Sequence, residues 1–255
     1  MEKRPRAVLL KFPGTNCDEE TSRALELVGF SPEVVPISVM TNETLSGVSL
    51  VVLSGGFSYG DYVMSGRLAS LVTEQKIGDA LKKFRDDGGY LLGICNGFQI
   101  LTQLGLLPKG SLVENTSGRF QCQWVTMQNH APESPFLSQL PETFELPMAH
   151  AEGRLVTMDA SEAKAYRESG AAAVTYTSDV NGSFEQIAGL QDESGRVFGM
   201  MPHPERFIYR EDHYDPDWES QPGTPSEPPS GLSEEKWGSG YYLFRSLYQS
   251  VTSSN

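Results

Sequence analysis

Cys95 is the residue of this sequence best placed for covalent chemistry. It stands in the stretch GICNG at residues 93–97, between the apolar run 90–94 and a segment with apolar residues at helical spacing. Two glycines around a nucleophile-capable residue at a strand-to-helix switch match the plan of a nucleophile elbow. The N-terminus of the following helix favours a thiolate through its dipole and free N–H groups. On this stretch alone, a small buried hydrophobic cysteine is an equally good interpretation.

A cysteine nucleophile needs a base and a group that orients the base. Four histidines are present, and His203 is the best placed of them, because Pro204 disfavours a helical conformation at His203. Residues i and i+2 of an extended segment point to the same side, so Glu205 can reach back to the imidazole. The carboxylate would fix the tautomer and leave the other ring nitrogen for the thiol. The alternative, a solvated turn, would be favoured if Cys95 were absent.

The glycine-rich loop at residues 54–61 is the third candidate part of a site, because it follows a predicted strand. Attack on an amide builds charge on an oxygen, which backbone N–H groups can stabilise. Gly56 has no side chain in the way, and Asn96 follows the nucleophile, so these two residues are the expected donors. Phosphate binding is the alternative. The loop lacks the Lys-Ser/Thr ending of a P-loop, and the chain contains no GxGxxG, so we prefer the oxyanion interpretation.

The elements that must position these residues alternate between strands and helices in the first 105 residues. Such alternation predicts an α/β fold with a parallel sheet and right-handed crossovers. Later strands are shorter and partly antiparallel. Predicted strands cover residues 6–12, 32–37, 48–53, 90–94, 120–127, 143–148, 155–158, 172–177, 187–190 and 196–201. Predicted helices start at Asp18 and stop at Gly29, include residues 77–84, follow Cys95 up to Gly105, and cover residues 240–251.

Composition limits the possible functions. The chain has 255 residues, enough for a single domain spanning 1–255, and its net charge of −13 argues against nucleic acid or an anionic membrane as a partner. No apolar stretch is long enough to span a membrane, and the short apolar run near the N-terminus reads as a strand rather than a signal peptide. Three cysteines without metal-ligand spacing indicate a reducing cytoplasm and no disulfide framework. Residues 212–236, rich in proline and acids, predict a surface insertion without core residues.

Several motifs resemble a known family. GICNGFQ at residues 93–99 and PHPE at 202–205 resemble the class I (triad) glutamine amidotransferases. The chain is most similar to the glutaminase subunits of phosphoribosylformylglycinamidine synthases. The motifs that carry this closer likeness are FPGTNCD at 12–18, GGFSYGD at 55–61, PMAHAEG at 147–153, NGS at 181–183 and GMMPHPER at 199–206.

The resemblance implies a flavodoxin-like amidotransferase fold and a role for each matching residue. Cys95 would be the nucleophile, His203 the general acid and base, and Glu205 its orienting group. Gly56 and Asn96 would supply the oxyanion hole, while Gly55, Gly56, Phe57 and Gln99 would hold glutamine. Residues 115–120 and 150–153 match segments near the site, without an assigned role. We interpret Cys17 as structural and Cys122 as a core residue, and expect no metal.

The resemblance also implies the reaction. The chain would hydrolyse glutamine and pass ammonia to a large synthase partner, with a small bridging subunit. The partner would use ATP and Mg²⁺ to convert formylglycinamide ribonucleotide into its amidine in purine synthesis, since this sequence contains no P-loop. No cofactor is expected on this chain. The rival hypotheses are a related cysteine hydrolase without glutamine specificity and a catalytically silent interaction subunit.

Overall fold

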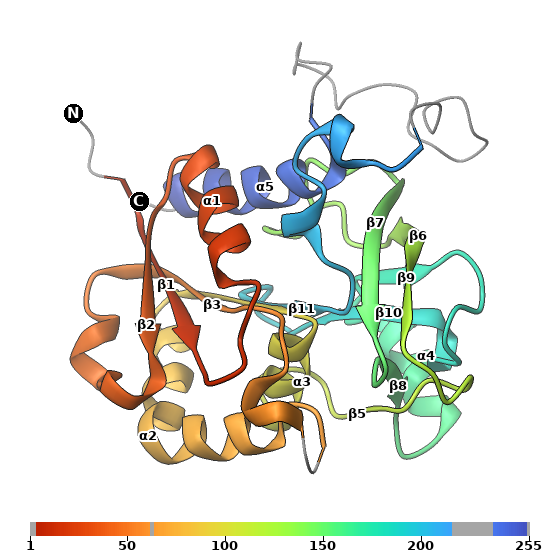
Figure 1. Cartoon of the computed structure of the whole chain (residues 1–255), viewed down its shortest axis with the longest axis horizontal. Coiled ribbons are helices and arrows are strands. Elements are labelled where there is room, and N and C mark those ends of the chain that lie inside the picture. The colour runs from red at the N-terminus through yellow and green to blue at the C-terminus, as the bar shows by residue number, and fades with distance from the viewer. Residues whose placement is uncertain (1–3, 62–63, 216–236, 254–255) are drawn as a thin grey trace.

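A nine-stranded sheet organises the part of the chain that this computed structural model describes, which is residues 4–61, 64–215 and 237–253. The strand order is β2-β1-β3-β4-β11-β10-β9-β6-β7 (Figure 1). The first five strands of this order are parallel, and the last four continue the sheet with antiparallel pairing. The predicted α/β fold, with a mainly parallel sheet and a smaller antiparallel portion, is confirmed.

The parallel strands bring the loops of interest to one edge of the sheet. All five run in the same direction, so the segments that follow four of them emerge side by side. Those segments carry Cys17, Gly55, Cys95 and His203. The run 90–94 is buried at every position, which explains why its bounds could be read from the sequence. The strands are β1 (Arg6–Lys11), β2 (Ser31–Pro36), β3 (Val48–Leu53), β4 (Tyr90–Ile94) and β11 (Val197–Met200).

The antiparallel strands form the wall opposite the glycine-rich loop. Along β7 every second residue is buried, from Phe144 to His150, so the side chain of His150 points inward. The other strands of this part are β6 (Gln121–Asn129), β9 (Val174–Tyr176) and β10 (Ile187–Gln191). A separate two-stranded ladder pairs β5 (Ser111–Val113) with β8 (Arg154–Val156).

Helices cover both faces of the parallel strands. Figure 1 shows α1 (Asp18–Val28) and α5 (Ser239–Ser253) together on one face, with α2 (Arg67–Asp86) and α3 (Asn96–Gln103) on the other. The glycine stop predicted after α3 is present: Gly105 is left-handed, and Leu106 N–H donates to Leu101 O at 3.1 Å. Among the described helices, none has the length and apolar character needed to cross a membrane.

Two helices differ from the sequence expectations. α2 starts at Arg67, well before residues 77–84, whose periodicity predicted the helix. The sequence did not reveal this earlier start, because the first turns of α2 expose Leu68 and Leu71 and so lack a clear amphipathic pattern. α4 (Ala160–Ser169) was not predicted, since Ala163 is its one buried residue. Its N-cap was readable: Asp159 accepts from the N–H groups of Ser161 and Glu162.

The placement of Cys122 in the core is wrong, because this residue is exposed. It lies at the start of β6, where the strand pairs with β7 alone; β9 joins only at Met127–Asn129. Of the predicted insertion, residues 216–236 lie outside the described residues. Its first part has core contacts, since His213 is 9% exposed and its ring lies 4.1 Å from that of Trp124.

Candidate active site

The backbone at Cys95 has the geometry of a nucleophile elbow. Cys95 has φ 51° and ψ −106° and stands between β4 and α3, a conformation that side chains rarely adopt. A side chain at Gly97 would collide with the carbonyl oxygen of Leu53, so glycine lets α3 pack directly on β3. The Cys95 thiol is nearly buried, lines the cavity described below and lies 3.8 Å from the carbonyl oxygen of Ala149. The strained turn therefore presents the Cys95 thiol to this cavity.

His203 and Glu205 form a buried pair at the end of β11. The imidazole Nδ1 lies 2.7 Å from Glu205 Oε1, and both side chains are almost fully buried. His203 is extended, as expected from Pro204, and its N–H donates to Pro147 O at 2.8 Å. Glu205 itself lies in a 3₁₀ turn, so the turn rather than a continuing strand returns its carboxylate to the ring.

The charge state of His203 follows from its neighbours. Burial on its own lowers the pKa of the imidazole, but the Glu205 carboxylate and the nearby thiols of Cys95 and Cys17 together hold that pKa well above its usual value. Because a carboxylate can only accept, Nδ1 carries the proton shared with Glu205. Nε2 has no hydrogen-bond partner within the described part of the chain. It is therefore the nitrogen left to act on the thiol and on a ligand.

The backbone at Gly56 aims one N–H away from the neighbouring chain. Gly56 forms an antiparallel bridge with Thr15, in which Phe57 N–H donates to Gly14 O at 3.0 Å and Asn16 N–H donates to Gly55 O at 3.4 Å. These flanking bonds turn the N–H of Gly56 to the opposite side. The N–H of Asn96, in the first turn of α3, is one of the helix donors without an intrahelical acceptor. Both residues can thus direct an N–H toward an oxyanion.

We expect Gly56→Ala to lower the glutamine-dependent rate by about a hundred- to thousandfold, as removal of an oxyanion donor does. Gly56 has φ +143°, and an added Cβ would lie 2.8 Å from Asn16 N and 2.8 Å from Gly14 O, so the loop must shift. Gly170→Ala is the matched control, since Gly170 also has a positive φ but open space around it. Steady-state glutaminase assays and thermal melts check this. A Gly56→Ala rate no lower than that of Gly170→Ala would contradict the assignment.

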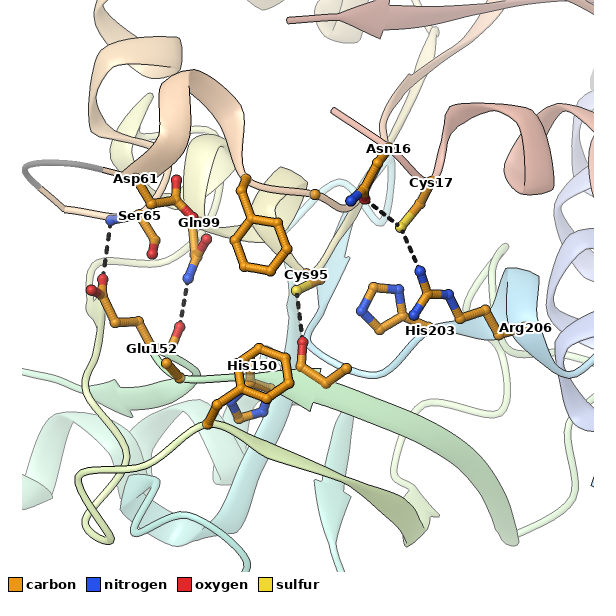
Figure 2. A pocket seen from close by; sticks show the side chains of 15 residues that line it. Asn16, Cys17, Asp61, Ser65, Cys95, Gln99, His150, Glu152, His203 and Arg206 are labelled. Carbon is orange, nitrogen blue, oxygen red and sulfur yellow. Dashed lines mark hydrogen bonds between the residues drawn. The ribbon is translucent and has the colours of Figure 1, made fainter. Parts of the chain in front are cut away.

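A cavity of about 220 Å³ joins these parts. Figure 2 shows Cys95 between two groups of side chains. On one side lie Asp61, Ser65, Gln99 and Glu152, and on the other lie Asn16, Cys17, His203 and Arg206. Gly56 and Phe57 also line the cavity, and the half-exposed rings of Phe57 and Phe120 are 6.5 Å apart.

Gln99 lines the cavity as expected, but its side-chain amide is already engaged. Its Nε2 donates to the carbonyl oxygen of Glu152, and its Oε1 accepts from Asn96 Nδ2 at 2.9 Å. The amide of Asn96 also reaches Asp61 Oδ1 at 3.3 Å and accepts from Ser58 N–H. Gln99 and Asn96 therefore tie the glycine-rich loop and the 150–153 segment to α3.

Sequence reasoning missed an acidic pair at the end of the cavity near α2. Glu152 Oε2 accepts from Ser65 N–H at 3.0 Å, and Asp61 Oδ1 accepts from Gly66 N–H at 3.2 Å. Burial raises the pKa of the Asp61 carboxyl, and the charge of Glu152 raises it further. The two carboxylates lie far apart in sequence, so no local spacing could have revealed them.

The structural interpretation of Cys17 is incomplete, because Cys17 also lines the cavity. Its Sγ lies 3.3 Å from Asn16 Oδ1 and accepts from Arg206 Nη2 at 3.2 Å. The atoms of Cys17, His203 and Glu205 that are able to bind a metal ion (the sulfur, a ring nitrogen and a carboxylate oxygen) all lie within 4.8 Å of one another. Burial raises the pKa of the Cys17 thiol, which favours its protonated form. One feature of the sequence could have placed Cys17 at the site: it comes just after a predicted parallel strand, and ligands of such sheets bind at the carboxyl ends of the strands.

Known proteins share this chain's sequence and fold. A model of the CobB/CobQ-like glutamine amidotransferase domain matches residues 4–245. The phosphoribosylformylglycinamidine synthase subunit PurQ of Thermotoga maritima is 42% identical over 207 residues, which covers 80% of this chain and 89% of that protein. The PurQ subunit of Dehalococcoides mccartyi is 36% identical over 254 residues, or 94% of each chain.

A solved structure extends this likeness to three dimensions. One chain of the PurLQS structure from Thermotoga maritima matches with a TM-score of 0.77 at 35% identity, covering 97% of this chain and 99% of that chain. The likeness therefore extends over nearly the whole fold rather than one motif. The chain belongs to the CobB/CobQ-like glutamine amidotransferase family and, within it, to the PurQ subunits of phosphoribosylformylglycinamidine synthase.

Proposed function

We propose that this chain hydrolyses glutamine to glutamate and ammonia with Cys95, His203 and Glu205 as a catalytic triad. The observation that carries the proposal is the buried His203–Glu205 pair, whose free Nε2 shares a cavity with the elbow thiol of Cys95. A thiol nucleophile, a base and an oriented carboxylate are the three groups that acyl transfer requires. Gly56 and Asn96 complete the arrangement as backbone donors.

The steps follow from the atoms. Cys95 gives its thiol proton to His203 Nε2, its Sγ attacks the side-chain amide carbon of glutamine, and the oxyanion is held by the N–H groups of Gly56 and Asn96. His203 Nε2 gives its proton to the amide nitrogen as the C–N bond breaks, so ammonia leaves. The same nitrogen then takes a proton from water, which attacks the thioester and releases glutamate. The Nδ1–H bond to Glu205 keeps the ring oriented through both steps.

The two ends of the cavity suggest how glutamine lies in it. Its amide must reach Cys95 and His203, so its amino acid end extends toward Asp61 and Glu152, whose carboxylates suit an α-ammonium group. The remaining glutamine contacts fall to Gly55, Gly56 and Phe57 in the loop. Gln99 acts by fixing Glu152.

The ammonia is proposed to serve a synthase partner. The relatives are named as subunits of phosphoribosylformylglycinamidine synthase, and the matching solved structure is named PurLQS. We propose a complex with a large synthase subunit that uses ATP and Mg²⁺ and with a small bridging subunit, for the amidine-forming step of purine synthesis. Within it, residues 1–255 act as one amidotransferase domain in the cytoplasm.

Activity should depend on docking. Tyr59 and Asp61 have φ of 55° and 51°, so the loop that carries Gly56 is held in a strained conformation that a partner can shift. We expect the isolated chain to hydrolyse glutamine about a hundred- to thousandfold more slowly than the complex, the effect of one misdirected oxyanion donor. Steady-state glutaminase rates check this, for the chain alone and for the chain reconstituted with synthase, small subunit and synthase substrate. Equal rates would rule out the gating and leave the triad standing.

The same assays test the proposed function itself. Reconstituted complex should form the amidine with glutamine as the only nitrogen source, and other amides should not replace it. A complex that uses ammonia alone, with no glutamine hydrolysis, would overturn the proposal in favour of a silent subunit. Equal hydrolysis of unrelated amides would favour a cysteine hydrolase without glutamine specificity.

A further inference from the structure

His150 is a second imidazole in the cavity for which the triad has no use. It ends β7, faces inward by strand alternation and is 3% exposed. Its neighbour Ala149 presents its carbonyl oxygen 3.8 Å from Cys95 Sγ, and both His150 and Cys95 line the cavity. Figure 2 shows the His150 ring below Cys95, on the wall opposite Asn16 and Cys17.

The hydrogen bonds of Asn115 determine which nitrogen of His150 carries the proton. Asn115 Nδ2 donates to the carbonyl oxygens of Arg119 at 3.0 Å and His150 at 2.9 Å, and both of those atoms can only accept. The amide is thereby oriented with Oδ1 toward the ring, where it lies 3.0 Å from His150 Nδ1 and also accepts from Gly153 N–H. Because Oδ1 is an acceptor, Nδ1 must be the protonated nitrogen.

His150 Nε2 is consequently unprotonated and can only accept a hydrogen bond. It has no hydrogen-bond partner among the residues that the structure describes, and it is shielded from solvent. Gly153 packs against the ring so closely that a side chain there would collide with it. Burial, with a smaller contribution from the neighbouring His203, lowers the pKa of His150 to about 4, so the ring stays neutral at neutral pH.

A carboxamide has one donor end and one acceptor end, and the cavity offers a partner for each. The N–H groups of Gly56 and Asn96 suit the oxygen, and a lone pair suits the NH₂ group. We propose that His150 Nε2 accepts a hydrogen bond from the side-chain NH₂ of glutamine and so selects glutamine against glutamate. This rests on the proposed function. A glutamate side chain would present a carboxylate oxygen to the same lone pair and be repelled. The site therefore binds the product glutamate less tightly than the substrate glutamine.

The test compares substrate and product binding in the reconstituted complex. We expect His150→Phe to raise the KM for glutamine by roughly tenfold, the effect of one lost hydrogen bond, while the Ki of glutamate as a competitive inhibitor stays equal or falls. The ratio of Ki to KM should therefore fall at least tenfold. His150→Gln, which offers an amide oxygen, should restore part of the ratio.

Controls separate this role from a structural one. A variant that merely disturbs the cavity would weaken glutamine and glutamate together and leave the ratio unchanged, and that result would overturn the inference. His130→Phe is the matched control, because His130 Nε2 bonds Thr175 Oγ1 at 2.9 Å outside the cavity, and its ratio should equal that of the parent. If melting shows that His150→Phe does not fold, His150→Leu provides the same comparison. Failure of the proposed function is distinct, since the parent complex would then not hydrolyse glutamine at all.

Discussion

Replacing Cys95 by serine should abolish glutamine-dependent amidine synthesis by the complex while ammonia-dependent synthesis continues at the parent rate. Among the three cysteines, only Cys95 combines a left-handed elbow, a helix N-terminus and a place beside His203. A serine hydroxyl is a far weaker nucleophile without a thiolate form, and the substitution changes one atom, so packing should be preserved. Both rates are measured on the same preparation, with glutamine or ammonium as the nitrogen source.

The other two cysteines are the controls for that experiment. Cys122→Ser alters an exposed residue and should leave both rates unchanged. Cys17→Ser tests whether a thiol is needed beside His203, since serine can still bond Asn16 and Arg206. A glutamine-like diazo ketone should alkylate Cys95 and spare the others. Glutamine use that survives in Cys95→Ser, or label found on Cys17 instead, would sink the assignment of the nucleophile.

Much of the fold could be predicted because its signals are local. The strands 48–53 and 90–94 are mostly apolar runs next to glycines, and their bounds were predicted correctly. α4 was missed because tertiary contacts bury only Ala163, so its sequence carries almost no amphipathic pattern. Cys122 was misplaced because an apolar-looking position says nothing about whether a neighbouring strand extends far enough to cover it.

The residues of the candidate site also fall into two groups, those that local motifs predicted and those that only tertiary packing brings together. Cys95, His203 and Glu205 stand in short motifs whose geometry follows from proline, glycine and residue spacing. Asp61 and Glu152 meet only through the packing of the glycine-rich loop against the segment after β7. The tautomer of His150 depends on Asn115, which lies 35 positions away and is itself oriented by two carbonyl oxygens. Such contacts are set by tertiary structure, and no spacing in one sequence encodes them.

His203→Ala should lower the glutamine-dependent rate by about a hundred- to ten-thousandfold, the range for loss of a general acid and base. His150 cannot substitute as the general acid, because its protonated nitrogen is turned to Asn115 and its ring stays neutral. Glu205→Gln should cost less, since Cys95 and His203 still meet and the amide oxygen can accept from Nδ1. A greater loss in a well-folded Glu205→Gln variant than in His203→Ala would mean that the roles are assigned wrongly.

The pH dependence of Glu205→Gln gives a second, independent readout. Glu205 raises the pKa of His203 against the opposing effect of burial, so its removal must lower that pKa. Departure of ammonia needs a proton on Nε2, and the rate therefore falls as pH rises through the His203 pKa. We expect the alkaline limb of the kcat profile to move to lower pH in Glu205→Gln. Glu152→Gln is the control, because Glu152 lies at the opposite end of the cavity and should change KM while leaving that limb in place. An alkaline limb that does not move in Glu205→Gln would show that the carboxylate does not set the protonation of His203.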